Sequence, residues 1–112
     1  MVAVCDAGPV GIGRLLSWTV EARALAPGAP FVVCVNRAPR AAFRRGELYE
    51  EIVSSLDAVD VVFVEHEGRV VDAAWDGRPV ARGRFTRAIS RLAEVVARTC
   101  AATSGDRLEV AS

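Results

Sequence analysis

The chain has 112 residues, of which 52% are hydrophobic and 25% charged, and its formal net charge at pH 7 is zero. This length allows one domain with a modest core, and the apolar content excludes a disordered chain. All 14 basic residues are arginines. These residues therefore offer no lysine as a Schiff base, a general base or a phosphate-binding group.

The three cysteines lack the spacing of a metal site. Cys5 and Cys34 lie in apolar segments and Cys100 lies near the end of a helical pattern, which is typical of reduced, buried thiols. The sequence has no apolar run long enough to cross a bilayer and no signal-peptide pattern. We therefore expect a cytoplasmic protein with reduced cysteines and no bound metal.

Short apolar segments alternate with helical patterns along the chain, which predicts parallel βαβ units. The strands are predicted at residues 2–5, 31–35 and 61–64. The helices are predicted at about residues 10–25, 47–56, 70–75 and 84–100. We expect a three-layer α/β fold, with a mostly parallel sheet and flanking helices in the order β-α-β-α-β-α. It would occupy residues 1–101 as a partial domain, followed by a polar C-terminal tail at 102–112.

Apolar residues at steps of three and four predict which face of each helix is buried. On the first helix this face holds Leu15, Trp18, Ala22 and Leu25. On the second it holds Leu48, Ile52 and Leu56. On the last it holds Phe85, Ile89, Leu92 and Val96.

Two segments together carry a family resemblance. The first segment is the apolar strand 31–35 with Asn36 and Arg37 at its end. The second is a short helix and turn followed by Phe85. It reads Arg69-Val70-Val71-Asp72-Ala73-Ala74-Trp75-Asp76-Gly77-Arg78-Pro79-Val80. In this order and spacing they resemble the C-terminal half of the MinD/ParA group of P-loop ATPases, which includes septum-site, chromosome-partitioning and pilus-assembly proteins. The resemblance covers about residues 1–98 and implies part of a P-loop NTPase fold.

The resemblance implies that Asn36 and Arg37 bind the adenine of ATP, because an asparagine and a following basic residue do so in this family. The position fits, since open α/β sheets bind ligands at the carboxyl ends of their strands. An asparagine amide also offers a donor and an acceptor in one plane. A structural role remains open, in which Asn36 only ends the strand and shapes the turn before Pro39.

Asp6 and Glu65 are further candidates for residues near the nucleotide. Asp6 resembles a Walker-B aspartate, but the family has another strand between that aspartate and the asparagine-bearing strand, and here only one helix intervenes. We therefore interpret Asp6 as a loop residue near the ligand and not as a magnesium ligand. Glu65 follows the third strand, where the family usually has a proline and an aspartate near the base.

A histidine between two carboxylates could suggest a metal site, but on a strand His66 would point away from both glutamates, so a shared metal is not expected. The Glu65-His66-Glu67 segment is therefore interpreted as a solvated loop. No Gly-Lys-Ser/Thr phosphate loop is present. Magnesium binding is therefore not expected without an N-terminal half, and this chain alone is not expected to hydrolyse ATP.

The last predicted helix carries arginines at helical spacing, namely Arg84, Arg87, Arg91 and Arg98. ParA-like proteins bind DNA non-specifically through basic residues in this half of the fold, so the resemblance implies a DNA- or partner-binding face. An ordinary solvated helix face is the alternative. Because the net charge is zero, any affinity for DNA should be weak.

The strand at residues 2–5 is apolar, which is typical of an interior strand of a sheet. Because it is the first strand of this chain, its outer edge would be left without a pairing strand. Three explanations stay open: an N-terminal half or another protein pairs with this edge, the edge pairs with itself in a homodimer, or the chain is a truncated or mispredicted gene product. The function that we expect is that of a MinD/ParA-like nucleotide-binding ATPase in partitioning or positioning. The alternative is a non-catalytic α/β protein-interaction module.

Overall fold

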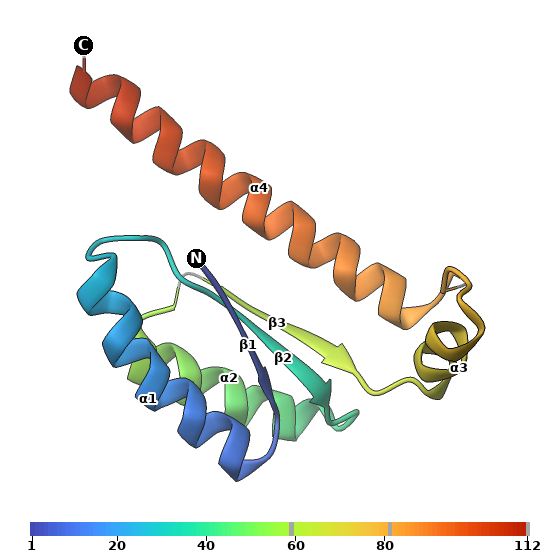
Figure 1. Cartoon of the computed structure of the whole chain (residues 1–112). Coiled ribbons are helices and arrows are strands. Elements are labelled where there is room, and N and C mark those ends of the chain that lie inside the picture. Colours follow the sequence, from blue (N-terminus) through green and yellow to red (C-terminus); the bar gives the residue numbers. More distant parts are fainter. Residues whose placement is uncertain (59, 81, 112) are drawn as a thin grey trace.

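The structure is a computed structural model of the chain, and it describes residues 1–58, 60–80 and 82–111, with side chains described up to residue 102. The described residues form a parallel sheet whose strand order is β1 (Val2–Asp6), β2 (Val32–Ala38), β3 (Asp60–Glu65). They also form the helices α1 (Pro9–Leu25), α2 (Ala42–Leu56), α3 (Gly68–Asp76) and α4 (Arg84–Ala111) (Figure 1). The prediction of an α/β fold with a parallel sheet is confirmed.

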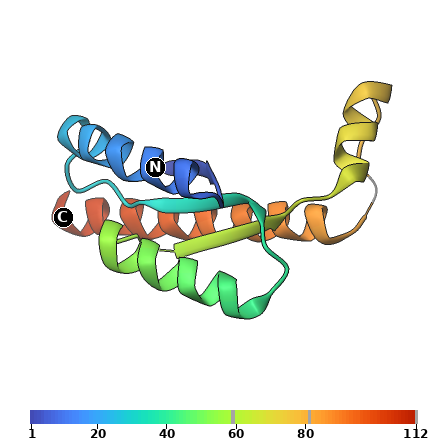
Figure 2. The ribbon, with the colours of Figure 1, turned by 90° about the horizontal axis from the view of Figure 1, so that it is seen from below.

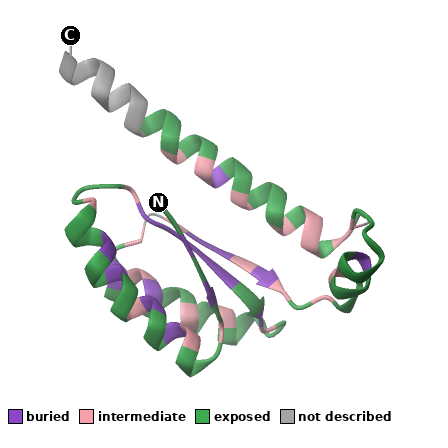
Figure 3. Cartoon of the chain, viewed as in Figure 1, coloured by how far each residue is buried: buried purple, intermediate pink, exposed green. Residues whose placement is uncertain are grey.

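The sheet is covered on both faces. Helices α1 and α2 pack on one face, around Val33, Val35 and Ile52. Helix α4 packs on the other face, where Leu92 and Val95 contact Val32 and Val62. Seen from below, α4 runs behind the strands, and α3 stands away from the rest of the chain (Figure 2). Buried residues accordingly concentrate on the strands and on the inner sides of α1 and α2 (Figure 3).

The predicted buried face of the first helix is partly wrong. Leu15 and Ala22 are buried, but Trp18 is 43% exposed and Leu25 is 88% exposed. Trp18 stacks on Phe31 with ring centroids 6.1 Å apart, and Leu25 is the last residue of α1. The residues that share the core with Leu15 and Ala22 are Ile12 and Thr19.

The first turn of α1 lies close to the end of β1. A Cβ atom on Gly11 would come within 2.4 Å of the Asp6 carbonyl oxygen. Because no side chain fits in that space, glycine at position 11 allows α1 to fold back directly onto the strand that precedes it.

Two helix boundaries also differ from the prediction. Helix α2 begins at Ala42 and not near residue 47, so Arg44 and Arg45 are helical. Its N-cap is Ala41, which makes no side-chain capping bond, so the sequence carries no start signal there. Helix α4 does not end at Cys100 but continues through the predicted polar tail to Ala111. The side chains of residues 103–111 lie outside the described residues, as does all of Ser112.

The buried stripe of α4 is shifted from the predicted one. Val95 is buried, whereas Ile89 is exposed. Leu92 packs beside Val95 against the sheet, as predicted. On α2, Ile52 and Leu56 are buried as predicted, and Leu48 is partly buried against the same core.

These helix faces predict different costs for two leucine truncations on α1. Leu15→Ala should lower the free energy of unfolding by about 2–5 kcal/mol, because it leaves a cavity in the core. Leu25→Ala should change it by less than about 0.5 kcal/mol, because that side chain is largely exposed. Urea unfolding of both variants measures the difference. Equal losses would contradict the observed orientation of the helix.

Candidate functional site

Polar residues end two neighbouring strands at the carboxyl edge of the sheet. Asp6 of β1 is paired in register with Asn36 of β2. Asn36 is in turn opposite Val64, the residue before Glu65 at the end of β3. Asp6 and Asn36 are exposed, and neither side chain has a hydrogen-bond partner among the described residues. The structure therefore brings Asp6, Asn36 and Glu65 to the same edge of the sheet and leaves the side chains of Asp6 and Asn36 accessible to solvent.

Arg37 lies in an irregularity of the sheet, because the register of β2 against β3 shifts between Asn36 and Ala38. Its φ of 53° is in the left-handed region. The side chain lines a groove of about 700 Å³ between α1 and α2, together with Pro39 and Arg44. Asn36 does not line this groove. Asn36 and Arg37, which are predicted to bind the adenine together, therefore do not line the same groove.

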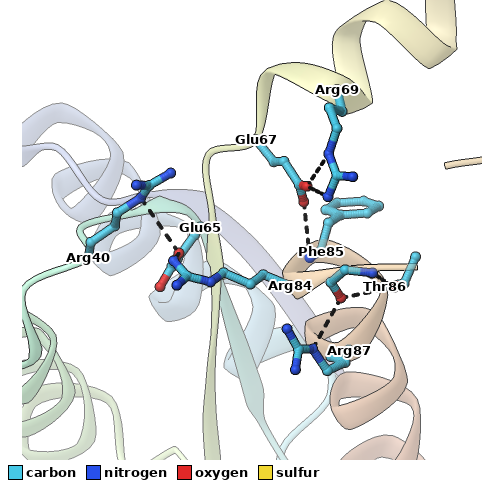
Figure 4. A network of polar contacts seen from close by, with 9 residues as sticks. Arg40, Glu65, Glu67, Arg69, Arg84, Phe85, Thr86 and Arg87 are labelled. Carbon is cyan, nitrogen blue, oxygen red and sulfur yellow. Dashed lines mark hydrogen bonds and ion pairs between the residues drawn. The ribbon is translucent and has the colours of Figure 1, made fainter. Parts of the chain in front are cut away.

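Glu65 is held by three arginines and does not lie in a solvated loop. Its Oε1 accepts a hydrogen bond from Arg45 Nη1 at 3.0 Å, and its Oε2 accepts one from Arg84 Nη1 at 3.2 Å. Arg40 Nε is 3.9 Å from Oε2 (Figure 4). Only 18% of the Glu65 side chain is exposed. This carboxylate ties the start of α2 and the start of α4 to the end of β3.

Glu67 is also engaged. It accepts a hydrogen bond from Arg69 Nε at 2.8 Å and one from the Phe85 backbone N–H at 3.2 Å (Figure 4). The bond from Arg69 lowers the pKa of Glu67 below its ordinary value. His66 between the two carboxylates is exposed. The solvated-loop interpretation is therefore wrong for both glutamates, because Arg45 and Arg84 bind Glu65, and Arg69 and the Phe85 N–H bind Glu67.

The predicted arginine face of α4 divides into separate parts. Arg84 is bound to Glu65. Arg87 and Arg91 line a groove of about 770 Å³ together with Arg82 and the hydroxyl residues Thr86 and Ser90. Arg98 is exposed further along the helix, outside that groove. DNA contact through these arginines stays a prediction, now centred on Arg87 and Arg91.

The cysteines offer no reactive group at the carboxyl edge. Cys5 and Cys34 are buried free thiols, as predicted, but the prediction of a buried thiol is wrong for Cys100, which is exposed on α4. Burial raises the pKa of Cys5 to about 11 and also raises the pKa of Cys34. Both therefore remain protonated at neutral pH and are poor nucleophiles. Within the described residues, no group of histidine, cysteine and acidic side chains could hold a metal ion.

Comparisons with known proteins add no relative: no protein-family model, no curated protein and no solved structure matches this chain. In the described part of the chain, no helix combines the length and apolar character that a bilayer span needs.

The Arg69 contact predicts a pH effect at Glu67. Because the pKa of Glu67 is lowered in the folded chain, its ionised form stabilises the fold above the ordinary carboxyl pKa, and this contribution is lost as the pH falls through the lowered pKa. In an NMR titration, Arg69→Gln should move the Glu67 midpoint upward. Arg78→Gln is the matched control, because Arg78 pairs with Asp76. An unchanged midpoint in Arg69→Gln would contradict the assignment.

Proposed function

We propose that this chain forms the base-binding end of a MinD/ParA-type nucleotide-binding domain that acts in nucleotide-dependent positioning or partitioning. The observation that supports the proposal is the placement of Asn36. It is exposed and unpartnered among the described side chains, at the carboxyl end of the middle strand of a parallel sheet. Ligands of open parallel sheets bind at such strand ends.

Asn36 would recognise the base of ATP. Its amide can donate one hydrogen bond and accept another in the plane of an adenine ring. Asp6 lies beside it in register and would limit where a negatively charged phosphate group can lie. Arg37 is exposed, and a guanidinium group can stack on an aromatic base. In this proposal Arg37 approaches the base from the α1–α2 side of the strand.

The described groups support binding better than hydrolysis. Phosphoryl transfer depends on a lysine, backbone amides and a magnesium ion that stabilise the phosphates, and these 112 residues include no lysine. Glu65 is not free to act as a base, since three arginines surround it. Hydrolysis would therefore require a P-loop from another polypeptide segment.

One observation favours the second candidate, a non-catalytic interaction module. Helix α3 stands away from the sheet (Figure 2). Trp75 on this helix is 86% exposed, and Val71, one turn earlier, is also exposed. Exposed tryptophans are frequent anchors of protein interfaces. This helix would be the contact element if the chain binds a protein and not a nucleotide.

An ATP titration followed by NMR tests the proposal. The chain should bind ATP weakly, with the largest shifts around Asn36, and should release no phosphate. Asn36→Ala should weaken binding about tenfold through the loss of hydrogen bonds to the base. Ser17→Ala, an exposed change on α1, is the control. Absence of ATP binding, or binding that Asn36→Ala leaves unchanged, would refute the base-binding role and favour the interaction module.

A further inference from the structure

The outer edge of β1 carries unpaired backbone groups. β1 pairs with β2 on one side, and no other strand in the described part of the chain pairs with it. The Val32 N–H donates to the Met1 carbonyl at 2.9 Å. Since successive residues of a strand direct their backbone groups to alternate sides, Ala3 and Cys5 face β2. The N–H and C=O groups of Val2 and Val4 and the N–H of Asp6 therefore face outward, whereas the Asp6 carbonyl lies against Gly11 of α1.

The apolar surface beside this edge is also uncovered. On the α4 side of the sheet, Val32 and Val62 are almost fully buried, whereas Val2 is 40% exposed and Val4 is 67% exposed. Helix α4 packs mainly over β3 and to a smaller extent over β2. The sheet therefore ends at β1 with both its hydrogen-bonding groups and its side chains exposed.

The opposite edge of the sheet is protected in the ways that edge strands usually are. β3 begins at Asp60 and ends at Glu65, so it carries a charged residue at each end. Charged residues on an edge strand discourage the addition of a further strand. β1 has one charged residue, Asp6, at its carboxyl end. This contrast singles out β1 as the edge that is built for pairing.

A groove of about 530 Å³ runs along the outer edge of β1 and is bordered by Arg14 and Trp18 of α1. Trp18 is partly exposed there. Arg14 has no ion pair or hydrogen bond among the described residues. The groove therefore offers backbone hydrogen bonds, the aromatic ring of Trp18, the guanidinium group of Arg14 and, at the carboxyl end of β1, the carboxylate of Asp6.

We propose that this groove binds an extended strand of another polypeptide, apolar on the side of Val4 and acidic on the side of Arg14. Strand addition of this kind draws its affinity from backbone hydrogen bonds and its specificity from alternate side chains. A second copy of this chain fits less well. A two-fold pairing of β1 with β1 would place α1 of both copies on the same face, and the two Arg14 side chains would meet at the junction.

Two synthetic peptides probe the groove: one of alternating valine and glutamate, and a matched one of alternating valine and lysine. The glutamate peptide should bind about threefold tighter, because a glutamate can pair with Arg14 and a lysine cannot. Its binding should slow hydrogen exchange at the Val4 and Asp6 amides, which face outward. Equal binding of the two peptides, or no protection of these amides by either peptide, would overturn the proposal.

Two variants sharpen the test. Val4→Pro removes an outward N–H without removing a bond to β2, as proline can do on an edge strand, and it should abolish peptide binding. Val4→Ala keeps the N–H and should retain it. Arg14→Glu should reverse the preference between the peptides. A stable dimer through β1 in sedimentation would also overturn the proposal. The outcome is independent of ATP binding, since Asn36→Ala alters neither Arg14 nor the β1 edge.

Discussion

Burial of one strand from both sides constrains the rest of this structure. Phe31 and the four residues that follow it, ending at Val35, are all almost fully buried. An uninterrupted apolar strand can be buried in this way only when helices cover both faces of the sheet and strands pair on both edges. The strand's first polar residue, Asn36, consequently emerges where that cover ends. The candidate site is placed by the same burial that stabilises the fold.

The carboxyl end of the sheet is divided between an accessible part and an occupied part. At β1 and β2, the side chains of Asp6 and Asn36 are exposed and free to meet a ligand. At β3, the Glu65 carboxylate is surrounded by arginines from α2, α4 and the segment before α2. A strand added parallel to β1 would end beside Asp6. The accessible part of the site and the open edge of the sheet therefore adjoin.

Much of the fold could be predicted from the sequence because its signals are local. Apolar strands alternating with helical patterns predict a parallel sheet, and the position of Asn36 near a strand end follows from that alone. Asp6 is interpreted from the sequence as a loop residue but is the last residue of β1. The face of α1 was harder to predict. Trp18 is apolar and correctly spaced, but it stacks on Phe31 near the sheet edge and stays partly exposed. Periodicity does not reveal how far a sheet extends beneath a helix.

The polar contacts could not be predicted, because they join distant residues. Glu65 binds Arg45, 20 residues earlier, and Arg84, 19 residues later. No local sequence motif indicates that Arg45 and Arg84 bind Glu65. The sequence alone therefore suggests a solvated loop for the Glu65-His66-Glu67 segment. The start of α2 at Ala42 could not be predicted for a different reason. Ala41 has no side chain that could cap the helix, so no local signal marks the first turn.

Hydrogen exchange of the free chain tests most directly whether the sheet is closed around β2 and open at β1. Amides of Val33 and Val35 should exchange slowly, because β2 is paired on both sides. Along β1, the Cys5 amide should exchange slowly and the Val4 amide rapidly, since only Cys5 faces β2. Equal protection of Val4 and Cys5 would show that the outer edge is already covered, and would contradict this account of the fold and of its open strand.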